Sequence, residues 1–87
     1  MLPLNYAILK YYTTIEDACA TDVIAALKGQ YGRFKALSRP AVIEALMTAE
    51  KNGLLEETRC ELNDQDELEV YYRANAEGKA TINKYIK

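Results

Sequence analysis

The chain of 87 residues is long enough for one small domain and too short for two. Its apolar fraction of 49%, charged fraction of 28% and net charge of −2 are those of an ordinary globular protein. No apolar run approaches the roughly 18 residues that span a bilayer, and the first residues lack the basic start and cleavage site of a secretory signal. We therefore expect one cytoplasmic domain, residues 1–87, without a membrane partner.

The residue types needed for most catalytic and metal sites are missing. The chain has no histidine, and its two cysteines, Cys19 and Cys60, are too far apart in sequence to form a CxxC pair. Both are expected to be small buried hydrophobic side chains rather than a disulfide or redox pair. Glycine-rich phosphate loops and nucleophile motifs are absent as well. We predict no enzyme, no cofactor, no metal and no catalytic residue.

Three helices are predicted in the first half of the chain. The first covers residues 4–12, where one apolar stripe of Leu4, Ile8 and Tyr11 is joined by a second on another face. The next is expected over residues 21–31, with Thr21 as its N-cap. A third should begin at Ser38, with Pro40 in its first turn, and end at the pair formed by residues 52 and 53.

A β-hairpin and a final helix are predicted beyond residue 53. Residues 55–62 and 68–74 alternate with the period of a strand and are joined by a polar segment of about five residues. On this pattern Thr58, Cys60 and Leu62 share one side of the hairpin, and Glu69 lies on the other, exposed side. Asn75 then caps a last helix.

Two short motifs resemble those of winged helix-turn-helix regulators of the PadR and MarR type. In AEKNGLLEE, residues 49–57, the end of a helix is followed by a glycine and two aliphatic residues that begin a strand. In YYRANAEG, residues 71–78, a strand is followed by a helix cap, polar residues and a glycine. The resemblance implies an α+β winged helix: three helices, a two-stranded wing and a C-terminal helix. The larger dimerisation domain of PadR-type regulators and any ligand-binding domain are absent, so no small-molecule ligand is implied.

The resemblance also implies a transcriptional regulator that binds double-stranded DNA with its third helix in the major groove. Ser38, Arg39 and, further along the helix, Ile43 and Met47 or Thr48 are then expected near DNA. Arg39 would pair with a guanine and Ser38 would hold a phosphate. The alternatives are that Ser38 only caps the helix and that Arg39 is a solvated charge.

Charge is distributed unevenly along the chain. Residues 28–39 contain four basic residues and no acid, whereas residues 40–77 contain ten acids and three basic residues. Lys28, Arg33, Lys35 and Arg39 are therefore candidate phosphate contacts, although a solvated basic loop explains them equally well. The acidic wing would be repelled by DNA, so it either points away from the duplex or binds a basic partner.

A homodimer is expected through the first and last helices. Aromatic and aliphatic side chains are enriched at interface cores, and the candidates are Tyr6, Leu9, Tyr12, Ile82, Tyr85 and Ile86. The alternative is that these side chains complete the core of a single copy. A second function also stays open, because winged helices serve as protein-interaction modules, here through the acidic wing or the tyrosine-rich helices.

Overall fold

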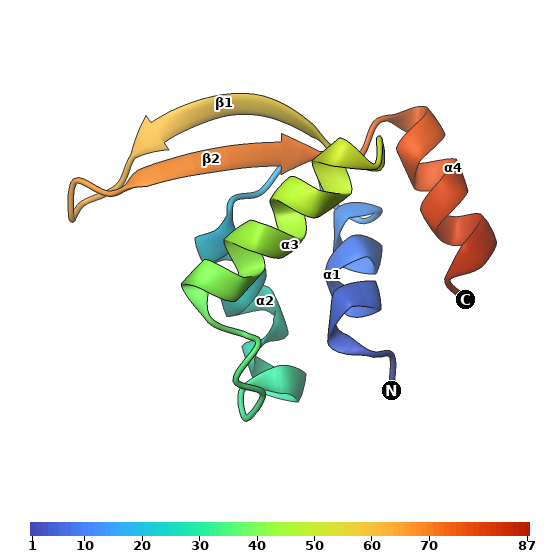
Figure 1. Cartoon of the computed structure of the whole chain (residues 1–87), viewed down its shortest axis with the longest axis horizontal. Coiled ribbons are helices and arrows are strands. Elements are labelled where there is room, and N and C mark those ends of the chain that lie inside the picture. Colours follow the sequence, from blue (N-terminus) through green and yellow to red (C-terminus); the bar gives the residue numbers. More distant parts are fainter.

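The computed structural model describes residues 1–87 as an α+β fold of four helices and a two-stranded antiparallel sheet (Figure 1). The order of the elements is that predicted from the sequence. In chain order they are α1 (Leu4–Tyr12), α2 (Ala20–Tyr31), α3 (Arg39–Lys51), β1 (Glu56–Leu62), β2 (Leu68–Arg73) and α4 (Ala76–Tyr85). None of the four helices has the length and apolar character needed to cross a bilayer.

The ends of α3 and α4 are fixed by the expected residues. Ser38 caps α3, its hydroxyl oxygen accepting a hydrogen bond from the backbone N–H of Ala41 at 3.4 Å. Gly53 follows α3 with a φ of 78°, a left-handed conformation that glycine adopts without strain. The side-chain oxygen of Asn75 accepts from the N–H of Gly78 at 2.8 Å and so caps α4.

The start of α2 differs from the prediction. The helix begins at Ala20, and Cys19 occupies the N-cap position that was expected for Thr21. The backbone N–H of Cys19 donates to the Asp22 carboxylate at 3.2 Å, and the Cys19 thiol donates to the same oxygen at 3.4 Å. Thr21 therefore lies in the first turn, where its hydroxyl is free for a contact with β2.

The hairpin has the predicted five-residue loop, but its side chains do not alternate as predicted along the whole of β1. Leu62 pairs with Leu68 and Cys60 with Val70. An irregularity between residues 57 and 59 leaves Thr58 as an extra residue in β1, so the prediction that it alternates regularly with Cys60 is wrong. Cys60 is exposed, which also corrects its prediction as a buried side chain.

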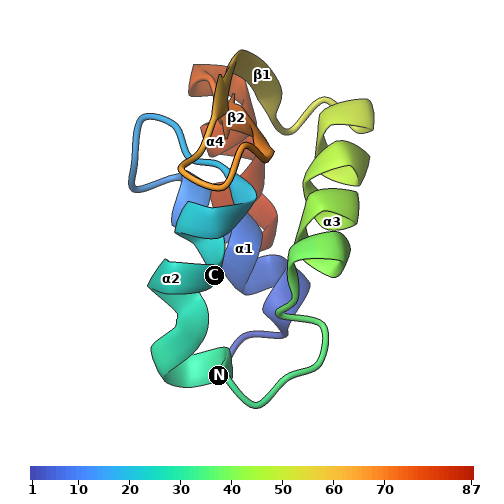
Figure 2. The ribbon, with the colours of Figure 1, turned by 90° about the vertical axis from the view of Figure 1, so that its left-hand side faces the viewer.

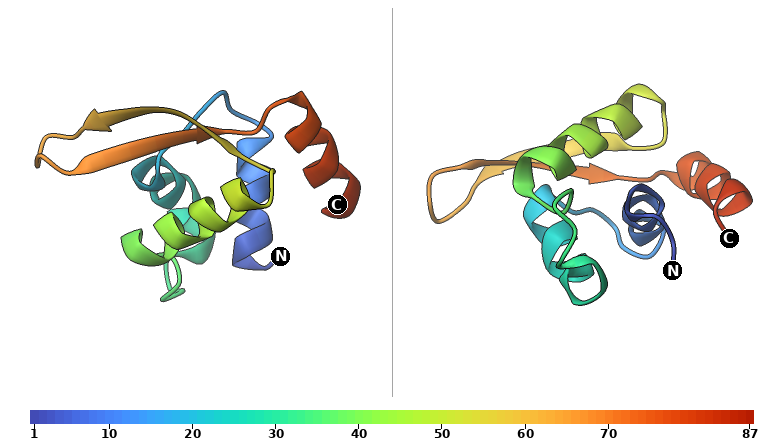
Figure 3. Two further views of the ribbon diagram at one scale, coloured as in Figure 1. Left: turned by 45° about the horizontal axis from the view of Figure 1, so that its top comes forward. Right: turned by 60° about the horizontal axis from the view of Figure 1, so that its bottom comes forward.

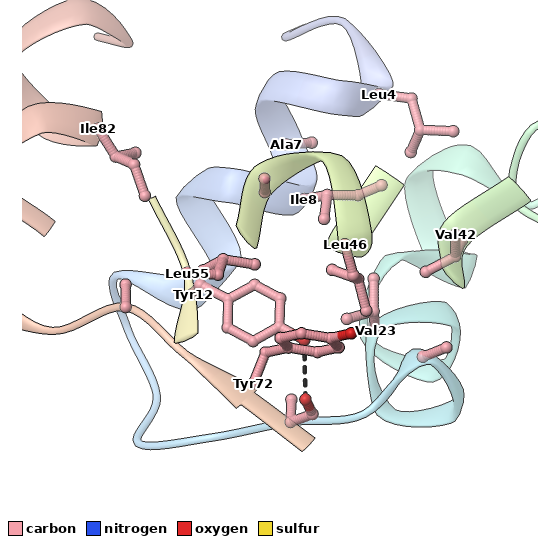
Figure 4. Packing of buried hydrophobic residues seen from close by; sticks show 14 of the residues in the cluster. Leu4, Ala7, Ile8, Tyr12, Val23, Val42, Leu46, Leu55, Tyr72 and Ile82 are labelled. Carbon is pink, nitrogen blue, oxygen red and sulfur yellow. Dashed lines mark hydrogen bonds between the residues drawn. The ribbon is translucent and has the colours of Figure 1, made fainter. Parts of the chain in front are cut away.

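One hydrophobic core joins the four helices and β2 (Figure 4). Tyr12 is fully buried, and its hydroxyl donates to the carbonyl of Ala18 at 2.8 Å. Ala18 also forms a two-way backbone bridge with Tyr72, at 3.0 and 2.9 Å. These bonds fasten the segment between α1 and α2 to the edge of β2 through one isolated bridge residue.

The hairpin loop projects away from the helices, and α4 lies at the opposite end of the molecule beside α1 (Figures 1 and 3). Viewed from the hairpin loop, α2 and α3 lie on opposite sides of the molecule, with the hairpin toward the top between them (Figure 2). This placement brings β2 close to the N-terminal ends of both α2 and α3.

Two glycines in helices are expected to respond oppositely to alanine. A Cβ atom on Gly78 would meet the carbonyl oxygen of Leu54 at 2.5 Å, so Gly78→Ala should lower the free energy of unfolding by about 1–3 kcal/mol. Gly29 lies in α2, and a Cβ atom there would have nothing within 4 Å, so Gly29→Ala should raise it by up to about 1 kcal/mol. Urea unfolding of both variants measures the two shifts; equal effects would contradict the close contact at Gly78.

Candidate nucleic-acid interface

Three exposed cations surround the connection between α2 and α3. Lys28 lies in the last turn of α2, and Arg33 and Lys35 lie in the segment that leads to α3, at the bottom of Figure 1. None of the three forms an ion pair, whereas Arg39, Arg59 and Arg73 are all paired with carboxylates. We call Lys28, Arg33 and Lys35 the basic turn.

The fourth candidate cation of this region, Arg39, is not free. Its Nη1 donates to the carboxylate of Glu69 at 2.7 Å and to the hydroxyl of Thr21 at 3.0 Å. Its Nη2 donates to the backbone carbonyl of Leu68 at 3.0 Å, and its Nε lies 4.0 Å from the carboxylate of Glu67. The guanidinium therefore links the start of α3 to β2 and to α2.

Glu69 is the other half of this arrangement and corrects the expectation of an exposed carboxylate. It is the one charged side chain in the interior, with 5% of its surface exposed. Besides Arg39, it accepts hydrogen bonds from the hydroxyl of Thr21 and from the side-chain amide of Asn63 at 3.4 Å. Burial raises the pKa of Glu69, but the hydrogen bonds from Thr21, Arg39 and Asn63 outweigh it and hold that pKa below its ordinary value.

The remaining candidates on α3 occupy different positions. Ser38 is engaged as the N-cap of α3, as its alternative interpretation expected, and the phosphate contact stays a prediction. Thr48 is exposed and lines a cavity of about 320 Å³ between α1 and α3. The exposed side of α3 also presents Ile43, Glu44 and Met47, and Lys51 is its first cation after Arg39.

The dimer candidates divide into two groups. Tyr12, Ile82 and Ile86 are buried in the core of the single chain, so their prediction as interface residues is wrong. Tyr6 is 49% exposed and Tyr85 73% exposed. These two tyrosines, with the partly buried Leu9, border an apolar groove of about 200 Å³ between α1 and α4.

A second arginine fastens the other strand of the hairpin. Arg59 forms ion pairs with Asp17 and Glu61, and its guanidinium carbon lies 3.9 Å from the centre of the Tyr71 ring. The hydroxyl of Thr58 donates to the same Asp17 carboxylate at 3.2 Å. Both strands of the hairpin are therefore tied to the helical part of the chain by charged contacts.

Comparisons of the chain with protein families, curated proteins and solved structures give no match. Function must therefore be inferred from the surfaces of this chain alone. The two that stand out are the basic turn and the acidic hairpin.

The buried carboxylate of Glu69 should make stability depend on pH. Because its pKa is lowered in the folded chain, its contribution is present above the ordinary pKa of 4.5 and is lost as the pH falls through the folded value. Glu69→Gln should therefore show a smaller decrease in the free energy of unfolding than the wild type between about pH 6 and pH 3. Urea unfolding at several pH values tests this.

Glu67→Gln is the matched control, because Glu67 faces the same arginine from an exposed position at 4.0 Å. It should keep the pH dependence of the wild type. If both variants behave alike, Glu69 does not carry the effect.

Proposed function

We propose that the chain is a winged-helix protein that binds double-stranded DNA and regulates transcription. The supporting observation is the basic turn: three unpaired cations, Lys28, Arg33 and Lys35, at the connection that leads into α3. In helix-turn-helix proteins the second helix of the motif enters the major groove and the first crosses the phosphate backbone, so a cationic connection between the two lies close to phosphates. Three helices, a hairpin and a last helix are also the element order of a winged helix.

DNA contact in this proposal is mainly to phosphates. Arg39 could reach a guanine only by leaving Glu69, which would give up a charged hydrogen bond of about 1.5–3 kcal/mol. A bidentate pair with guanine gives about 1–3 kcal/mol of discrimination, so the exchange has little net gain. Glu44, exposed one turn further along α3, adds repulsion. We therefore propose binding with weak sequence preference.

The hairpin takes no part in DNA contact in this proposal. Its loop carries Asp64, Asp66 and Glu67, all exposed, and these carboxylates would be repelled by phosphates. The duplex instead lies against the basic turn, away from the hairpin loop (Figure 1).

Two copies are proposed to act together through Tyr6, Leu9 and Tyr85 on the side of α1 and α4. Three phosphate contacts give modest affinity for one copy, and pairing doubles them. The exposed tyrosines border an apolar groove, and tyrosine is enriched in the cores of protein interfaces.

Neutralising the basic turn should abolish DNA binding. For the wild-type monomer, three neutralised phosphates predict a slope of roughly −2.7 for log K against log salt concentration. The triple variant with Lys28, Arg33 and Lys35 changed to Gln should lose most of its affinity and its salt dependence. Fluorescence anisotropy with a labelled duplex measures both.

The matched control changes the same number of charges elsewhere: Lys79, Lys84 and Lys87 to Gln, in and after α4. It should bind DNA almost as the wild type does. Equal losses in the two triple variants would show a general charge effect, and a wild type without salt-dependent binding would refute DNA binding itself.

Introducing a negative charge at the exposed tyrosines should separate the two copies of the proposed dimer. Tyr6→Glu and Tyr85→Glu place carboxylates at exposed positions on the α1–α4 side, so the fold should persist while association is lost. Sedimentation equilibrium gives the mass. The same substitution at exposed Phe34, beside α2, is the control and should leave a dimer intact; a wild type of monomeric mass at all concentrations would contradict the dimer.

A further inference from the structure

Four large apolar side chains are exposed on one side of α3 and on the hairpin beside it. Ile43 and Met47 lie on successive turns of α3 and are 37% and 47% exposed. Leu62 and Leu68, paired across the hairpin, are 68% and 56% exposed. We call these four residues the α3–hairpin face.

One hydrogen bond between the two elements, together with the register of each, indicates that these side chains lie on the same side of the molecule. The carbonyl of Leu68 accepts a hydrogen bond at 3.0 Å from Arg39, the first residue of α3. Ile43 follows Arg39 by four residues, so it lies on the same side of the helix one turn further on. On the hairpin, Leu68 lies on the same side of β2 as Tyr72, which packs in the core with Leu46 of α3 (Figure 4). That side of the hairpin therefore faces α3.

The surroundings of the face are acidic. Glu50 on α3 and Glu57 on β1 are exposed, and Glu44 is exposed where the face meets the cavity between α1 and α3; none of the three forms an ion pair. Lys51 is the one cation on α3 outside the Arg39 network. The apolar residues are therefore bordered by free negative charge.

This combination selects among possible occupants. Nucleic acid and anionic lipid would be repelled by the three carboxylates. A second copy docked by two-fold symmetry would bring the same carboxylates against one another. A segment with apolar residues on one side and cations at its borders would bury the four apolar side chains and pair with the free carboxylates.

We propose that the α3–hairpin face binds a basic amphipathic helix of a protein partner. The apolar side of that helix would cover Ile43, Met47, Leu62 and Leu68, and its lysines or arginines would pair with Glu44, Glu50 and Glu57. This is the recognition mode of a helix laid on an apolar surface. The proposal goes beyond DNA binding and uses residues other than the basic turn.

A synthetic helical peptide with leucines on one side and lysines at its borders is the probe. Titrated into the ¹⁵N-labelled full chain, it should give saturable amide shifts in α3 and the hairpin. Met47→Lys should weaken binding about tenfold or more, since it removes an apolar contact and repels the peptide. Phe34→Lys, the same kind of substitution at an exposed position between α2 and α3, should leave the affinity unchanged.

A second peptide, with glutamates in place of the lysines, tests the charge argument and should not bind. Absence of saturable binding by the basic peptide would overturn the proposal. So would equal binding of the two peptides, or shifts confined to the groove between α1 and α4. DNA binding by the basic turn is measured separately, so either proposal can fail alone.

Discussion

The ion pair between Arg39 and Glu69 is the constraint on which the placement of the hairpin depends. A two-stranded hairpin has little stability of its own and must pack on other elements. Here the packing includes a buried carboxylate, which is costly unless its charge is met by hydrogen bonds. Arg39 from α3, Thr21 from α2 and Asn63 from the hairpin itself provide them. Three elements are thereby held at one point.

The same interaction limits what α3 can do. Its first residue, which in a DNA-reading helix is well placed to reach a base, has its donors directed at Glu69, Thr21 and Leu68. The next exposed positions offer apolar and acidic side chains, Ile43, Glu44 and Met47. The unpaired cations nearest to the start of α3 lie before the helix, in the basic turn. Positive charge therefore lies at the connection between α2 and α3, and negative charge lies on the hairpin side of the molecule.

Local sequence patterns were sufficient to predict the order of the elements and the ends of α3 and α4, because these boundaries are set by short-range effects. Ser38 and Asn75 accept hydrogen bonds from residues three positions on, and Gly53 adopts a positive φ where α3 stops. Errors arose where the determining contact is distant in sequence. Glu69 alternates like an exposed strand residue, and its burial depends on Arg39, thirty residues away. Tyr12 was expected at an interface because tyrosine is enriched there, but it is buried in a core that includes residues as distant in sequence as Tyr72 and Ile82.

The two proposed surfaces differ in how salt should act on them, and that difference follows from their composition. The basic turn consists of three long, exposed cations with one exposed aromatic neighbour, Phe34, so its attraction to phosphate is mainly electrostatic and weakens as counterions are added. The α3–hairpin face combines four apolar side chains with three carboxylates, so salt would weaken only the charged part while apolar burial persists. At the ionic strength of a cell the Debye length is about 8 Å. Salt would therefore weaken binding at the α3–hairpin face less than binding at the basic turn. A DNA contact built on three cations needs a second copy or a bound partner to persist there.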